Sequence, residues 1–193
     1  MGNYTDLFCG DEELAESVIH WLRKHVHPMA RHRIAYSTNW DDGYRVLGWI
    51  VSQPDCDRAT AIHVFWAALP HEIIDPADER SAARRSDPSD VVHLLELVIE
   101  GLEKGYYQEE NFETQWSDEW QRGLQEFSSL LERSSDVDPK WRLALSLKPK
   151  RPIYEWNAHP AYPEGIPSEI YEKLIGKWVL QPLNPIIDTG HRN

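Results

Sequence analysis

The stretch from Asn39 to Leu69, NWDDGYRVLGWIVSQPDCDRATAIHVFWAAL, constrains the fold of this chain more than any other. It holds two short apolar runs that each follow an acidic turn, and Pro54 and Pro70 stand after the two runs. An aspartate accepts hydrogen bonds from the free N–H groups at the start of a helix, and proline ends a helix because it has no N–H to donate. We therefore predict two capped helices joined by a short turn, an αα-hairpin that acts as a scaffold.

Acidic residues and apolar spacing define the two helices of this hairpin. Asp41 or Asp42 is predicted to cap the first helix and Asp57 the second, and the loss of one such cap costs about 1 kcal/mol. Apolar residues recur at intervals of three and four, which is the spacing of one helix face. The residues predicted to face inward are Val46, Leu47, Ile50 and Val51 in the first helix, and Ala59, Ile62, Phe65, Trp66 and Leu69 in the second.

The same periodicity predicts helices on both sides of the hairpin. These helices are expected to cover residues 11–27, 29–37, 88–105 and 116–133, with Asp11 capping the first and Gly105 ending the third. Residues 70–90 form a polar loop that is punctuated by proline. The run 142–147 fits either a helical turn or a strand, because periodicity does not separate the two in a short apolar run.

These patterns predict an all-α fold, a single-domain helical bundle of short antiparallel helix pairs. The length of 193 residues is that of one domain, and nine Trp, eight Tyr and four Phe are enough to fill a sizeable core. The helical domain is expected to span residues 1–151. Proline recurs beyond it, so residues 152–193 are predicted to be a proline- and aromatic-rich C-terminal extension packed on the same domain.

The net charge of −12 is unevenly distributed along the chain. Residues 72–138 hold 18 acidic and 6 basic side chains, so this segment alone carries a charge of −12. Such a segment repels phosphate groups, which argues against binding to nucleic acid or to a membrane. It attracts basic protein surfaces and raises the rate of association with them. The alternative is that the acidity only keeps the protein soluble.

Several features indicate a cytoplasmic protein. The N-terminus lacks a basic region followed by an apolar run, so it does not predict a signal peptide. No apolar stretch approaches the length of a membrane span. Two cysteines, Cys9 and Cys56, are too few for a disulfide framework. We therefore expect reduced thiols and a cytoplasmic location.

Three histidines near the N-terminus, His25, His27 and His32, form a candidate metal site together with Asp41 or Asp42. Their spacing fits neither H-E-x-x-H nor any C-x-x-C pairing. His25 also falls on the apolar face of its predicted helix. The favoured interpretation is that these histidines are partly buried polar groups or surface groups, and no metal or cofactor is predicted.

The aspartates of the hairpin do not predict a catalytic or metal centre either. Asp41 and Asp42 stand about 15 Å from Asp55 and Asp57 if the helix between them has about a dozen residues, which is too far for one ion. A thiolate at Cys56 would be disfavoured by the aspartates beside it, so a small buried group is the better interpretation. The sequence contains no G-x-S-x-G, phosphate-binding loop or dinucleotide-binding motif. An enzyme is therefore not the favoured function.

The segment from Tyr106 to Trp120 is the candidate binding surface, because it places aromatic side chains among carboxylates. Aromatic anchors ringed by charge are typical of a protein interface. The alternative is a core helix with an acidic solvated face, which suits Trp116 and Trp120. The partner-binding candidates are Tyr106, Tyr107, Glu109, Glu110, Glu113, Asp118 and Glu119.

The hairpin resembles a bacterial family known only as domain of unknown function 4274. The pattern of that family is N-W-D-D-G, an apolar helix, P-x-C-D and then x-x-T-A before an apolar run. It corresponds here to Asn39, Trp40, Asp41, Asp42 and Gly43, then Ile50, Pro54, Cys56, Asp57, Thr60, Ala61, Phe65 and Trp66. The resemblance covers residues 39–66 and their surroundings, and it implies a small helical bacterial domain without naming an activity or a catalytic residue. By analogy, such domains resemble accessory or immunity proteins that accompany toxins.

Charge and resemblance together favour an immunity or antitoxin type of protein. It would bind a cognate toxin that has a basic surface and occlude that toxin's active site with its own acidic, aromatic surface. One alternative is an adaptor or chaperone for a secreted effector, which would bind an unfolded or N-terminal segment. A second alternative is an unrecognised metal-dependent hydrolase that uses the histidines and aspartates near the N-terminus.

Overall fold

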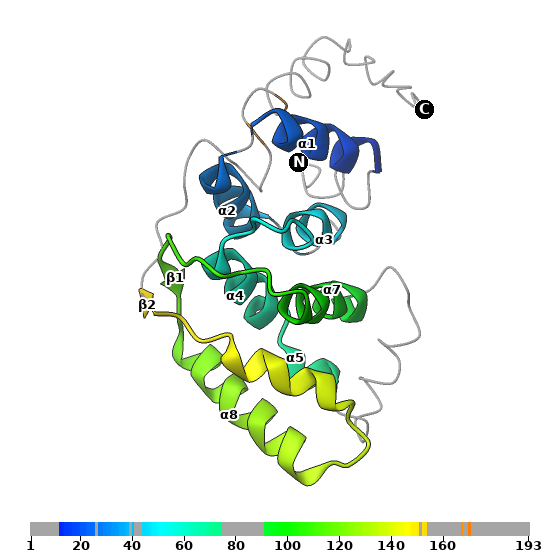
Figure 1. The fold of residues 1–193 in the computed structure, drawn as a ribbon, viewed down its shortest axis with the longest axis vertical. Helices are drawn as coiled ribbons and strands as arrows, with labels where there is room; N and C mark the ends of the chain where they lie inside the picture. The colour runs from blue at the N-terminus through cyan, green and yellow to red at the C-terminus, as the bar shows by residue number, and fades with distance from the viewer. Residues whose placement is uncertain are drawn as a thin grey trace, which may run out of the picture.

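A computed structural model describes residues 12–25, 27–38, 40, 44–74, 91–150, 152–153, 167 and 170. These residues are mostly helical, which confirms the predicted all-α single-domain bundle (Figure 1). The helices are α1 (Glu12–Lys24), α2 (Pro28–Ser37), α3 (Arg45–Val51), α4 (Arg58–Ala67), α5 (Pro70–Ile73), α7 (Val91–Glu103), α8 (Asp118–Arg133) and the 3₁₀ helix η3 (Pro139–Ser146). One short parallel pairing joins β1 (Thr114–Gln115) to β2 (Pro152–Ile153).

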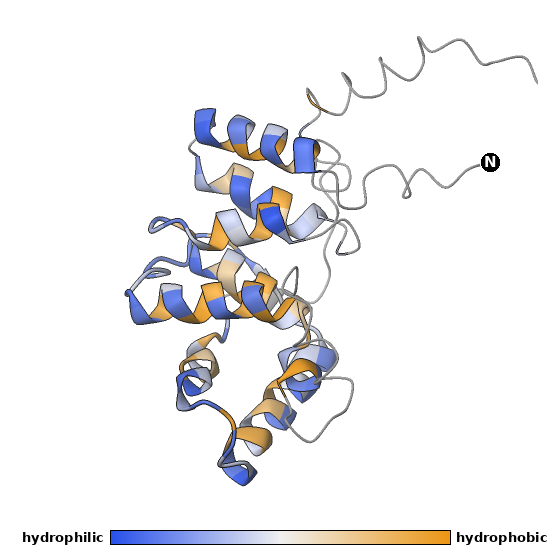
Figure 2. Ribbon diagram, turned by 90° about the vertical axis from the view of Figure 1, so that its right-hand side faces the viewer, coloured by the Kyte–Doolittle hydropathy of each residue, from blue (hydrophilic) through white to orange (hydrophobic). Residues whose placement is uncertain are grey.

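The second helix of the hairpin, α4, is the centre of the molecule. Every residue from Ala59 to Trp66 is buried, so α4 is covered all round and not only along the predicted stripe. The elements that pack against it are α2, α3, α7, α8 and β1. Helix α1 is amphipathic by contrast, and in Figure 2 it turns its hydrophobic side towards the other helices.

The start of α4 is held by the predicted cap. Asp57 is buried, and one carboxylate oxygen accepts the N–H of Ala59 at 2.9 Å. The other oxygen accepts the N–H of Asn111 at 2.8 Å, which the sequence did not indicate. In α3 the N-cap is Tyr44, and its side chain makes no capping bond. The caps predicted for that helix, Asp41 and Asp42, lie outside the described residues.

The end of α7 turns the chain back across the bundle. Gly105 adopts a left-handed conformation with φ of 73°. Its N–H reaches the carbonyl of Leu102, and the N–H of Tyr106 reaches the carbonyl of Gly101. This is the double hydrogen-bond pattern that closes a helix at glycine, and it confirms the predicted C-cap. Gly101 matters for a second reason, because a Cβ at this position would lie 2.1 Å from the hydroxyl oxygen of Tyr107.

Other helix boundaries differ from the predictions. Helix α8 begins after Ser117, whose hydroxyl accepts the N–H of Trp120 at 3.2 Å, so Trp116 precedes the helix. The ambiguous run 142–147 lies almost entirely in the 3₁₀ helix η3. The predicted loop begins with the short helix α5, and its remainder, residues 75–90, lies outside the described residues. The same holds for Asp11 and for most of the predicted extension 152–193.

Asp57→Ala tests the double role of this cap. We expect the free energy of unfolding to fall by about 3 kcal/mol, because a cap worth about 1 kcal/mol and a further bond to a charged acceptor are both lost. Urea denaturation provides the measurement. The control is Asp138→Ala, which removes an exposed N-cap whose carboxylate accepts the N–H of Lys140, and which we expect to cost about 1 kcal/mol. Equal losses in the two variants would show that the contact with Asn111 contributes nothing.

Candidate functional site

The candidate binding segment is mainly the chain between α7 and α8, here named the acidic connection (residues 104–117). It leaves α7, crosses the start of α4 and reaches β1 before α8 begins (Figure 1). It lies against the scaffold helices, because main-chain groups of the connection bond directly to the start of α4. The N–H of Arg58 donates to the carbonyl of Glu109 at 2.8 Å, and Asp57 accepts the N–H of Asn111.

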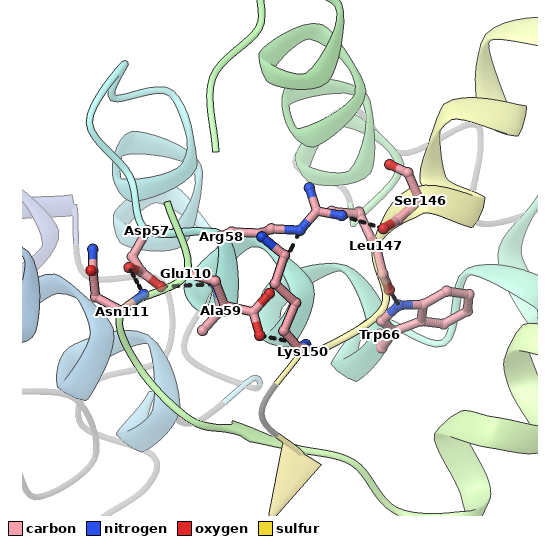
Figure 3. A network of polar contacts seen from close by, with 9 residues as sticks. All are labelled: Asp57, Arg58, Ala59, Trp66, Glu110, Asn111, Ser146, Leu147 and Lys150. Atoms are coloured by element: carbon pink, nitrogen blue, oxygen red, sulfur yellow. Dashed lines mark hydrogen bonds and ion pairs between the residues drawn. The ribbon is translucent and has the colours of Figure 1, made fainter. Parts of the chain in front are cut away.

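Glu110 makes a second set of contacts near the start of α4 (Figure 3). Its side chain is 1% exposed, and one oxygen accepts the N–H of Lys150 at 2.5 Å. The other oxygen lies 3.7 Å from Nε of Arg58. The guanidinium of Arg58 also donates to the carbonyl of Ser146. The contacts of Glu110 and Arg58 therefore join three segments that are distant in sequence: the start of α4, the acidic connection and the chain that follows η3.

Two of the predicted partner-binding residues are structural instead. Tyr107 is 1% exposed, and its hydroxyl donates to the carbonyl of Val51 at 2.5 Å. That carbonyl belongs to the last turn of α3, where no further helix N–H is available. Burial raises the pKa of the Tyr107 phenol. Since Glu110 is equally enclosed, the prediction that Tyr107 and Glu110 form an exposed surface is wrong.

The remaining candidates keep their side chains in contact with solvent. The exposed acidic residues are Glu109, Glu113, Asp118 and Glu119, and Tyr106 is half-buried. Glu109 accepts a bond from the side-chain amide of Asn111 at 3.2 Å. Asp118 and Glu119 occupy the first turn of α8, where a negative charge also stabilises the helix. We name the four exposed acidic residues the acidic ridge.

The two tryptophans of this segment belong to the core. Trp116 and Trp120 are 7% and 9% exposed, and their rings meet edge to face at 6.0 Å. Trp116 also meets Trp66 of α4 edge to face at 5.9 Å. The interpretation of these residues as core aromatics is therefore confirmed. Neither tryptophan is exposed beside the acidic ridge.

The histidines near the N-terminus are not brought together. His25 is exposed and its ring stacks on that of Trp21 with 3.9 Å between the ring centroids, so it is a surface group, as the favoured interpretation allowed. His27 caps α2 by accepting the N–H of Met29 at 3.1 Å. His32 is buried elsewhere, against α4. Within the described ranges, no three His, Cys, Asp or Glu side chains are grouped so that they could hold a metal ion.

The acidic turn before α4 is explained by packing and pairing. Cys56 is buried, as predicted, and burial followed by the charge of Asp57 raises the pKa of its thiol. Asp55 accepts a bond from Arg31 at 2.6 Å, and that bond lowers the pKa of Asp55. Since Arg31 is itself buried, the ion pair fixes the turn against α2.

Sequence analysis missed a pair of buried histidines, His32 on α2 and His63 on α4. Nδ1 of His32 lies 2.9 Å from the hydroxyl of Thr60, and its ring also bonds to the main chain of Glu113. Burial lowers the pKa of His32 to about 4 and that of His63 to about 3. The sequence does place His63 inside an otherwise apolar helix. That position indicates a buried histidine only once the helix is known to be buried on every side.

Comparison with known families identifies the scaffold. Residues 27–99 match the family described as Domain of unknown function (DUF4274). This confirms the resemblance that residues 39–66 predicted, and it extends the matched region from the N-cap of α2 into α7. Comparison with curated proteins and with solved structures finds no match. The acidic connection and α8 lie outside the residues that match DUF4274.

In the described part of the chain, none of the helices has both the length and the apolar composition to cross a bilayer.

Tyr107→Phe tests whether this tyrosine anchors the acidic connection. Removing the hydroxyl leaves the carbonyl of Val51 buried without its donor, so we expect the free energy of unfolding to fall by about 1–2 kcal/mol. The control is Tyr106→Phe, which makes the same chemical change at a half-buried neighbour, and its expected effect is within about 0.5 kcal/mol. Both are measured by equilibrium denaturation. Similar values for the two tyrosines would contradict the anchoring role of Tyr107.

Proposed function

We propose that this protein is a protein-binding module of the immunity or antitoxin kind, and that the acidic ridge is its contact surface. The ridge consists of Glu109, Glu113, Asp118 and Glu119. Its partner would be a toxin or effector with a basic surface, and binding would occlude the partner's active site. The observation that carries the proposal is that solvent-facing carboxylates stand on a main chain that is fixed to the buried core.

The anchoring of the connection supports binding because it limits the entropy lost on association. Interface loops that order only on binding lose affinity to that ordering. Here Asp57 accepts the N–H of Asn111, and Glu110 accepts the N–H of Lys150. These bonds fix the main chain of the acidic connection, so the neighbouring carboxylates stand on a fixed backbone. Glu109 and Glu110 are adjacent in sequence but differ in environment, since the first is exposed and the second enclosed.

The wider charge distribution supports attraction of a basic partner. Of the twelve acidic residues between positions 91 and 138, ten are exposed, against three basic residues in the same range. The exposed acidic residues are Glu100, Glu103, Glu109, Glu113, Asp118, Glu119, Glu126, Glu132, Asp136 and Asp138. An excess of one sign steers oppositely charged partners and speeds their association.

The occlusion model follows from the chemistry of the expected target. An enzyme that cuts nucleic acid or binds nucleotides needs positive charge around its active site, because its substrate carries phosphates. An acidic ridge on a rigid backbone would compete with that substrate for the same positive groups. Co-expression with the product of the adjacent gene tests the biological role: growth arrest by that product alone and rescue by this protein support immunity. A neighbour that is harmless alone, or toxicity that persists, contradicts it.

Charge reversal at the ridge tests the surface itself. We expect Glu109→Lys with Glu113→Lys to lower the association rate constant for the adjacent gene product at least tenfold at low salt, and the difference to shrink as salt screens the charges. Stopped-flow or surface-based kinetics provide the measurement. The double variant is chosen to leave the first turn of α8 unchanged.

A matched control separates a local surface from net charge. Glu132→Lys with Asp136→Lys makes the same change in net charge near the other end of α8, at two exposed positions. We expect this control to slow association by less than about threefold. Equal effects of the two pairs would mean that only the total charge matters. Binding of an isolated N-terminal segment of the partner, with no contact to its active site, would favour an adaptor over an immunity protein.

A further inference from the structure

Two buried imidazoles, His32 on α2 and His63 on α4, lie next to the chain that runs from the acidic connection into α8. His32 bonds to Thr60 on α4 and to the main chain of Glu113 in the connection. Its ring centroid lies 4.7 Å from that of Phe112, which is also in the connection. A neutral imidazole has one nitrogen that donates a hydrogen bond and one that accepts. A neutral His32 can therefore donate to the carbonyl of Glu113 and accept from the hydroxyl of Thr60.

The second histidine, His63, contacts α2 and the first turn of α8, just after the acidic connection ends. His63 stacks on Tyr36 of α2 at 3.7 Å with an interplanar angle of 19°. Its other contact is with Trp120 in the first turn of α8, at 5.6 Å. Neither ring nitrogen of His63 makes a hydrogen bond of ordinary geometry, although the side chain is only 6% exposed. The histidine pair therefore contacts the chain on both sides of Glu113 and joins it to α2 and α4.

The groups around the pair disfavour added positive charge. On α2 the charge of Arg33 lowers the pKa of His32, whereas Tyr36 stacks on His63 through an uncharged ring. His32 also lowers the pKa of His63, after the larger effect of burial. The main-chain contributions, from Glu113 to His32 and from the carbonyl of Ala35 to His63, act in the opposite direction but are outweighed by burial. The remaining contacts, Thr60, Phe112 and Trp120, carry no charge.

We propose that His32 and His63 form an acid-sensitive latch, which holds the acidic connection against α2 and α4 when neutral and releases it when protonated. The latch is a positioning device for the acidic ridge, because Glu113 is bonded to His32 through its own main chain. Its effect on a partner rests on the proposed function: acid would loosen the backbone that presents the ridge and weaken binding. The release itself is a property of this chain alone.

The direction of the pH effect follows from the two protonation states. In the latched form the pKa of His32 is about 4, whereas an exposed histidine has a pKa near 6.5. Well above pH 6.5 neither form binds the proton, so protonation does not favour release. As the pH falls from 6.5 to 4, the released form takes up a proton that the latched form does not. Between pH 7.5 and pH 5.0, His32 alone raises the equilibrium constant for release about thirtyfold.

Amide hydrogen exchange of the purified full chain, followed by mass spectrometry, tests the latch without a partner. After correction for intrinsic exchange rates, we expect protection of peptides covering residues 108–117 to fall at least thirtyfold between pH 7.5 and pH 5.0. Peptides within α7 report opening of the whole domain, and they should lose clearly less protection. Equal loss in both regions would overturn the latch, because it would indicate global unfolding.

Two pairs of substitutions test the assignment to these histidines. His32→Gln with His63→Phe keeps a donor for the carbonyl of Glu113 and an aromatic stack on Tyr36, but removes both titrations. We expect the extra loss of protection at pH 5.0 to disappear. His20→Gln with His93→Gln removes two exposed histidines, and here the loss should persist. A response that survives the first pair, or vanishes with the second, would overturn the proposal.

A titration of the unmodified chain covers the case in which the first pair fails to fold. Imidazole proton shifts followed by NMR should place both native-state midpoints below pH 5, and a midpoint near 6.5 for either ring would overturn the latch. These measurements separate the latch from the proposed function. Charge reversal at pH 7.5 tests the ridge while the latch is closed, and hydrogen exchange tests the latch with no partner present.

Discussion

The hydrogen bonds accepted by Asp57 are the interaction on which the rest of the structure depends. Helix α4 is buried from Ala59 to Trp66, so the free N–H groups in its first turn need a partner within the protein. One oxygen of Asp57 satisfies the helix, and the other satisfies the N–H of Asn111. The same carboxylate therefore closes the central helix and fixes the acidic connection upon it.

This arrangement divides the acidic residues into two groups. Asp57 and Glu110 are enclosed. Their carboxylates accept hydrogen bonds from main-chain N–H groups, and Glu110 also pairs with Arg58. The acidic ridge faces solvent and has no comparable structural role. The division is physically necessary, because a buried carboxylate must be paired or hydrogen-bonded, whereas an exposed one contributes little to folding. The proposed binding function therefore concerns only the second group, which stands on a backbone held by the first.

The sequence predicted what depends on local chemistry. The cap at Asp57, the glycine end of α7 and the all-α class follow from neighbouring residues and helical spacing, and the structure confirms all three. The errors concern contacts between distant segments. Tyr107 and Glu110 have the composition of a surface, but they are buried because Val51 and Lys150 approach them from elsewhere in the chain. Periodicity also assigned α4 one buried face, since it carries no information about how many helices surround it.

Equilibrium unfolding of Glu109→Gln and Glu110→Gln tests the central claim most directly. The two substitutions are chemically identical and one residue apart, so only the environment differs. We expect Glu110→Gln to lower the free energy of unfolding by about 3 kcal/mol, because it leaves Arg58 without its charged partner in an enclosed site. The expected change for Glu109→Gln is within about 0.5 kcal/mol. Equal losses, or a larger loss at Glu109, would contradict the division between structural and exposed carboxylates.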